Sequence, residues 1–137
     1  MSTDKASPQL IQQRLRNRLI EWLELVVASE KAAPAYGLDE LLNDWEPWNS
    51  ELNSTTNFPP PTYNEAEVST LLDVDKAWGQ FCDVTPNSIR DEFEVMQLPE
   101  WVGFISATRY ALSVFRIRGK LSEEREQTSI SPTKHST

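Results

Sequence analysis

Apolar residues recur at every third or fourth position in three long segments of this chain, and this spacing restricts the fold more than any other feature of the sequence. We expect the first helix to begin at Pro8, after Ser7 as its cap, and to run to about Glu30. Pro34 and Gly37 follow it as stop signals. The predicted apolar face of this helix consists of Ile11, Leu15, Leu19, Trp22 and Val26.

Two further long helices are predicted in the second half of the chain. Asn64 followed by Glu67 is the signature of a capping box, and Pro99 and Gly119 mark the start and the end of the last helix. The predicted apolar face of the earlier helix consists of Leu71, Val74, Trp78 and either Phe81 or Cys82. That of the last helix consists of Trp101, Ile105, Thr108, Leu112 and Phe115.

Shorter elements are expected between these helices. Residues 38–45 predict a short helix that Pro47 ends, and Thr85 with Pro86 predicts the entry of a second one that carries Phe93 and Met96. A strand over residues 91–98 is the alternative to this second short helix.

The range 47–62 predicts an irregular loop. Its three consecutive prolines, Pro59 to Pro61, favour an extended polyproline II stretch. This stretch is either a spacer between helices or a Pro-rich ligand for another protein.

These patterns together predict an all-α protein with a single domain. The expected domain covers residues 1–121 and has about five helices, three long and two short, around the irregular Pro-rich central loop. Residues 122–137 are almost free of apolar side chains and predict a disordered tail. With only 4 glycines in 137 residues, the chain does not resemble a β-sandwich or barrel, which needs frequent turns.

The chain offers few residues for catalysis or metal binding. His135 is the single histidine and Cys82 the single cysteine, so neither a nucleophile with a histidine base nor a four-ligand zinc site is available within one chain. We therefore expect no enzymatic activity, no cofactor and no metal. The lone cysteine and the absence of a secretory or membrane-spanning segment lead us to expect a soluble, cytoplasmic protein.

Charge is distributed unevenly along the chain. Between Glu21 and Glu100 there are 17 acidic residues and only 3 basic ones, whereas the first 20 and the last 37 residues each sum to +3. An acidic domain of this kind repels nucleic-acid phosphates and anionic lipids and attracts basic proteins. We therefore predict a basic protein partner, and neither nucleic acid nor membrane as a ligand; acidity that serves only solubility is the alternative.

Two elements, Trp45-Glu46-Pro47-Trp48 and Leu98-Pro99-Glu100-Trp101, carry a resemblance over most of residues 9–125. The chain resembles a set of small acidic proteins of Gram-negative bacteria that have no established activity. The resemblance implies a bacterial, cytosolic origin and no functional residue.

Two functions of different kinds fit these observations. The first is a protein-binding module, in the manner of immunity proteins that neutralise a basic toxin, because aromatic side chains among acids suit an interface. Its predicted partner-binding patch consists of Asp44, Trp45, Glu46, Trp48 and Glu51. The second is a self-associating structural or regulatory protein that uses the stripe from Trp101 to Phe115 as its seam. The expected oligomeric state is a monomer or a homodimer.

Three arginines interrupt the first predicted helix. By helical phase, Arg14 and Arg18 lie on one flank of its apolar face and Arg16 on the opposite flank, so they do not form one basic surface. We expect all three to be solvated and to act as partners of the acidic middle of the chain, with Arg18 pairing with Glu21.

Overall fold

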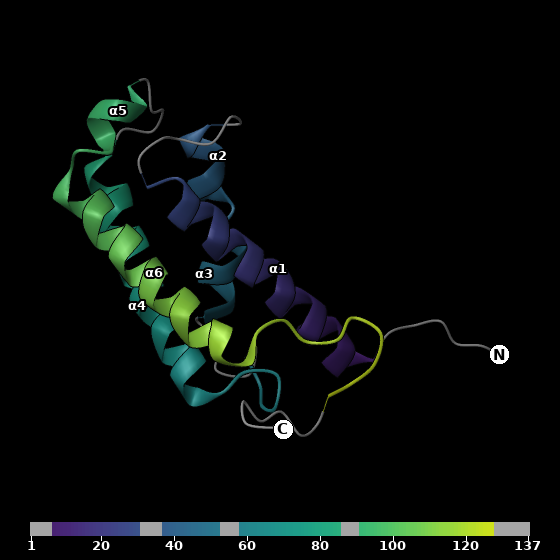
Figure 1. The fold of residues 1–137 in the computed structure, drawn as a ribbon. Coiled ribbons are helices and arrows are strands. Elements are labelled where there is room, and N and C mark those ends of the chain that lie inside the picture. Colours follow the sequence, from purple (N-terminus) through teal and green to yellow (C-terminus); the bar gives the residue numbers. More distant parts are fainter. Residues whose placement is uncertain (1–6, 31–36, 53–57, 86–90, 128–137) are drawn as a thin grey trace.

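The structure is a computed structural model, and it describes residues 7–30, 37–52, 58–85 and 91–127, with the backbone alone for residues 50–52. These ranges contain helices and no strand, which confirms the expected all-α class (Figure 1). In chain order the helices are α1 (Pro8–Ala28), α2 (Leu38–Asn43), α3 (Glu46–Leu52), α4 (Glu65–Val84), α5 (Glu92–Val95) and α6 (Pro99–Arg118).

The ends of the three long helices confirm the signals in the sequence. The Ser7 hydroxyl accepts a hydrogen bond from the Leu10 N–H at 3.1 Å and caps α1. At the start of α4, Asn64 and Glu67 exchange side-chain to backbone hydrogen bonds of 2.8 and 3.1 Å, which is the predicted capping box. Gly119 ends α6 with a φ of 74°, a conformation that glycine adopts without strain.

The central region differs from the prediction. The expected loop over residues 47–62 begins with a helix, α3, because Pro47 lies in its first turn, where the missing N–H group has no intrahelical partner to lose. The predicted polyproline II stretch is wrong: residues 59–63 form a turn in which the Tyr63 N–H donates to the Pro59 carbonyl at 3.0 Å. The helical alternative for residues 92–95 is confirmed and the strand is wrong, while its predicted entry at Pro86 lies outside the described residues.

A single apolar core joins the helices. Helix α6 packs along α4 and also along α1, and α2 and α3 connect α1 to α4 on the other side (Figure 1). Two tryptophans fix α2 in place, because the indole N–H groups of Trp22 on α1 and Trp78 on α4 donate to the carbonyls of Leu41 and Leu42 at 3.0 and 2.9 Å. The predicted stripe on α6 from Trp101 to Phe115 is buried in this core.

The first half of α1 has a different neighbour. We name residues 119–127 the C-terminal strap; they run along this part of α1, which extends beyond α6 (Figure 1). The strap contacts the face that carries Gln13 and Asn17, both buried, whereas Ile11 and Leu15 of the predicted apolar face are 46% and 40% exposed. The prediction for the start of α1 is therefore wrong, because polar side chains that bind the strap decide which face is covered.

The strap overlaps the predicted disordered tail. Residues 122–127 are hydrogen-bonded to α1, and residues 128–137 lie outside the described residues. The division of the chain at residue 121 stays a prediction. Within the described ranges, no helix has both the length and the apolar character that are needed to cross a membrane.

Candidate functional site

One residue of the predicted partner-binding patch lies in the core of the structure. Trp45 has no exposed area: its ring stacks on Trp22 at a centroid distance of 5.0 Å, and its indole N–H donates to an Asp75 carboxylate oxygen at 2.9 Å. This tryptophan is therefore a core residue, and its side chain does not reach the surface of the folded chain.

The other residues of the patch differ in exposure. Trp48 is half-buried and packs against the ring of Phe58 at 6.3 Å, whereas Asp44 and Glu46 are exposed. Partial burial raises the pKa of Asp44, and the nearby charge of Glu40 adds to this effect. The side chain of Glu51 lies outside the described residues. Of the side chains in the patch that the structure describes, Asp44 and Glu46 are exposed and Trp48 beside them is partly covered.

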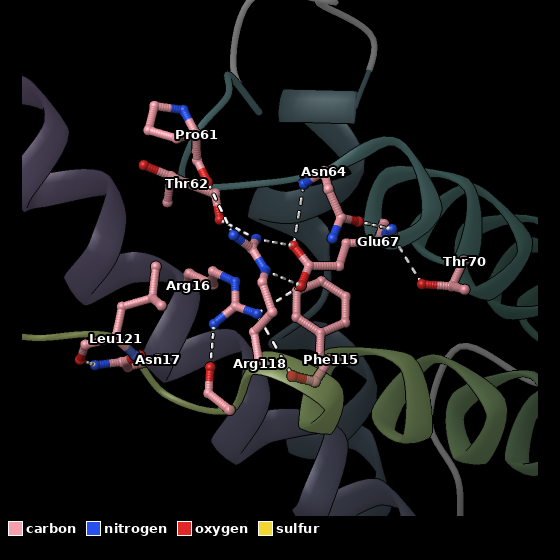
Figure 2. Close-up of polar contacts among 11 residues, drawn as sticks. Arg16, Asn17, Pro61, Thr62, Asn64, Glu67, Thr70, Phe115, Arg118 and Leu121 are labelled. Carbon is pink, nitrogen blue, oxygen red and sulfur yellow. Dashed lines mark hydrogen bonds and ion pairs between the residues drawn. The ribbon is translucent and has the colours of Figure 1, made fainter. Parts of the chain in front are cut away.

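A second group of residues, which no pattern in the sequence predicts, joins three helices near the start of α4 and the end of α6. The carboxylate of Glu67 in α4 accepts from Arg16 of α1 at 2.6 Å and from Arg118 of α6 at 2.5 and 3.1 Å (Figure 2). The side chains of Arg16 and Glu67 are fully buried, and that of Arg118 is 5% exposed. We call these three residues the buried ion cluster.

Backbone carbonyls balance the excess positive charge of this cluster. Arg118 donates to the carbonyls of Pro61 and Thr62 at 3.0 and 2.7 Å, and Arg16 donates to that of Gly119 at 2.5 Å (Figure 2). The Arg16 guanidinium also lies 5.0 Å from the centre of the Phe115 ring, in a cation–π contact. Burial on this scale leaves no room for a substrate, so the cluster holds α1, α4 and α6 together rather than binding a ligand.

The prediction for Arg16 is wrong in one respect and right in another. Its side chain is buried rather than solvated, because Glu67 and the end of α6 surround it. It does pair with an acid from the middle of the chain, as expected. Arg14 and Arg18 are exposed, and Arg18 contacts Glu21 at 3.1 Å as predicted. The capping-box glutamate was visible in the sequence, but no local signal links it to two arginines 51 positions away on either side.

Two buried polar atoms at this end, the Arg16 Nε and the Tyr63 hydroxyl, have no hydrogen-bond partner among the residues that the structure describes. Burial raises the pKa of Tyr63 above its ordinary value; the positive charge of Arg16 opposes this shift and the negative charge of Glu67 adds to it. The Tyr63 hydroxyl is therefore kept neutral in the folded chain well into the alkaline range.

Ion pairs divide the molecule into two regions. All seven ion pairs among the described residues involve a base from α1, α6 or the strap, and Glu67 is the one acid of α2 to α5 that takes part. Lys76 is the one basic residue that the structure describes between positions 37 and 108. In the part of the chain from α2 to α5, the exposed acids that form none of these ion pairs are Glu40, Asp44, Glu46, Glu65, Asp73, Asp83, Asp91 and Glu94.

A surface pocket of about 370 Å³ lies beside α6. It is lined by Met96, Trp101, Val102, Ile105 and Ser106, together with Glu30 and Arg109. The two charged side chains pair with each other, so neither is available as a free acid or base for a reaction.

Cys82 does not have the properties of a reactive thiol. It is half-buried, and burial raises its pKa, with further contributions from the negative charges of Asp83 and Glu46. A thiol with a raised pKa is protonated at neutral pH and is a poor nucleophile. Among the residues that the structure describes, no three His, Cys, Asp or Glu side chains are grouped in a way that could hold a metal ion.

Comparison of the chain with models of protein families, with curated proteins and with solved structures gives no match.

Proposed function

We propose that this chain is a non-enzymatic protein-binding module that presents the acidic surface of α2 to α5 to a basic protein partner. The observation that supports the proposal is the separation of charge: bases are paired on α1, α6 and the strap, whereas the exposed acids of α2 to α5 form no ion pair within the described residues. Unpaired surface charge of one sign accelerates association with a partner of opposite sign and makes it sensitive to salt.

An immunity protein that neutralises a basic toxin domain in a bacterial cytoplasm is the form of this function that we favour. Such a role needs affinity and no catalysis, in keeping with the paired charges of the surface pocket and the raised pKa of Cys82. A toxin gene beside the gene for this chain would support this form of the proposal.

The surface predicted for self-association, the alternative function, is not exposed in the structure. The stripe from Trp101 to Phe115 is buried between the helices of one chain, so it is not available to a second copy. Light scattering over a range of concentrations tests this point, and we expect a monomer.

Affinity capture from a bacterial lysate, with the wild type and a triple variant as baits, tests the proposal. The variant neutralises three acids of the proposed surface together, by Glu40→Gln, Asp44→Asn and Asp73→Asn. The matched control neutralises three acids that take part in ion pairs on the other region, Glu21→Gln, Glu24→Gln and Glu123→Gln. We expect the wild type and the control to retain the same basic proteins, released by salt, and the first variant to lose them. Equal retention by both variants, or retention of duplex DNA instead of protein, would contradict the proposal.

A further inference from the structure

Phe93 is the most exposed large apolar side chain among the described residues, at 74%. It belongs to α5, a single helical turn in which the neighbouring side chains of Val95 and Met96 are buried in the core. An aromatic ring that faces water while its neighbours are buried adds little to the stability of the fold, because apolar side chains stabilise a protein by leaving water.

The turn that carries Phe93 is joined to α2 by one hydrogen bond and is capped by its own residues. The Glu92 carboxylate accepts a hydrogen bond from the Leu38 N–H at 2.6 Å, which ties α5 to the start of α2. Asp91 caps the turn itself, because its carboxylate accepts from the Glu94 N–H at 3.1 Å. Phe93 is therefore presented on a fixed support, and binding through it would cost little conformational entropy.

Acidic residues precede and follow this position along the chain. Asp91, Glu92 and Glu94 belong to the same turn or its cap, and Glu100 follows in the first turn of α6. No ion pair involves any of these four residues within the described part of the chain. Protein interfaces commonly place a few aromatic anchors, which contribute most of the binding energy, at the centre and polar residues at the rim.

From these observations we infer that Phe93 is the anchor of the docking surface, which binds an arginine-rich face of a basic protein. An arginine of the partner stacks on the Phe93 ring, and other basic side chains lie opposite Glu94 and Glu100. Arginine suits this position better than lysine, because its planar guanidinium stacks on aromatic faces. This inference rests on the proposed function and moves the anchor from Trp45, which is buried, to the opposite end of α2.

The test uses an arginine-rich peptide and a lysine-rich peptide of the same length and charge, with binding to the full chain measured by calorimetry at low salt. Phe93→Ala should weaken the arginine peptide about tenfold and the lysine peptide less, as expected for the loss of an aromatic anchor. Ile117→Ala is the matched control, because Ile117 is 63% exposed on α6, at the basic end of the bundle, and its loss should leave both affinities unchanged. Thermal unfolding of both variants should match that of the wild type.

The outcomes separate this inference from the proposed function. If the wild type binds the arginine peptide and Phe93→Ala binds it equally well, the α5 surface is wrong while the acidic binding module stands. If the wild type binds neither peptide, the proposed function fails together with the inference. A dimer in light scattering that Phe93→Ala converts to a monomer would overturn the inference and assign the ring to self-association.

Discussion

The two ends of the helical bundle differ in whether their charged side chains are buried and paired or exposed and unpaired. At the strap end, where α1 and α4 begin and α6 ends, Arg16, Glu67 and Arg118 are buried and hydrogen-bonded to one another (Figure 2). At the α5 end, Asp91 and Glu94 are exposed beside Phe93 and form no ion pair within the described residues. The first arrangement holds the helices together, and the second leaves charge available for another molecule.

The difference has an energetic basis. A charge inside a protein is tolerated only when partners replace the water that it loses, so removal of one partner from a buried group is costly. A charge at the surface keeps its water, and its replacement usually changes the free energy of unfolding by less than about 0.5 kcal/mol. Substitutions at the two ends should therefore differ in size, and they test the comparison directly.

The largest effect is expected for Glu67→Gln. The amide keeps the shape of the side chain but leaves two buried guanidinium groups without a negative partner, so the free energy of unfolding should fall by about 3–5 kcal/mol. Urea unfolding followed by circular dichroism measures the change. Glu65→Gln, which removes the same charge from an exposed position in the same helical turn, is the matched control and should have little effect. Equal effects of the two substitutions would show that the buried ion cluster does not stabilise the fold.

A smaller loss of stability is expected for Asn17→Ala, which removes two hydrogen bonds between α1 and the strap. The Asn17 side chain donates to the Leu121 carbonyl at 2.8 Å and accepts from the Leu121 N–H at 2.9 Å, so its loss leaves two buried backbone groups unpaired. We expect a decrease of about 1–3 kcal/mol in the free energy of unfolding.

Faster trypsin cleavage at Arg125 should accompany this change, because the strap loses the hydrogen bonds that attach Leu121 and Glu123 to α1. Asn43→Ala, at an exposed asparagine of α2, is the control. A strap that is cleaved at the wild-type rate in Asn17→Ala would show that other contacts hold it.

Alkaline pH should destabilise the folded chain through the buried side chain of Tyr63. Because burial raises the pKa of Tyr63 in the folded chain, the unfolded chain loses this proton first, and stability falls as the pH rises above about 10. Over this range the wild type should lose up to about 1.4 kcal/mol per pH unit relative to Tyr63→Phe.

Urea unfolding between neutral and alkaline pH provides the measurement. Tyr110→Phe is the control, because Tyr110 lies on the exposed side of α6 in contact with water. A Tyr63→Phe variant with the same alkaline slope as the wild type would contradict the assignment.

The smallest effect is expected at the α5 end. Asp83→Asn with Glu94→Gln removes two exposed acids, and the free energy of unfolding should change by less than about 0.5 kcal/mol for each, measured in urea. A loss above about 1 kcal/mol would mean that these acids stabilise the fold, and the contrast between the two ends would not hold.

Much of the local structure could be predicted from the sequence, because the signals for it lie within a few residues. The cap at Ser7, the capping box of Asn64 and Glu67, and the glycine after α6 are each formed by groups that are neighbours along the chain. The sequence predicts a stop at Pro47, and α3 contradicts this, because a proline in the first turn of a helix is compatible with its start.

The candidate site was harder to predict, since exposure depends on the whole fold. Trp45 and Trp48 have similar sequence surroundings, yet the first is fully buried against Trp22 and the second only partly covered. The sequence predicts Phe93 and Met96 on one short helix, but in the structure Met96 is buried with Val95 and Phe93 is exposed.

The sequence by itself determined the helical class, the three long helices and the excess of acid in the middle of the chain, because periodicity, caps and composition are local properties. Only the tertiary structure decided which face of α1 is covered, that Arg16 lies inside, and which charges are left unpaired. The partners that settle these questions are Glu67, Gly119 and Leu121, which lie 51, 103 and 104 positions away from the α1 residues they bind. Contacts over such separations depend on how the helices pack, and no local pattern encodes them.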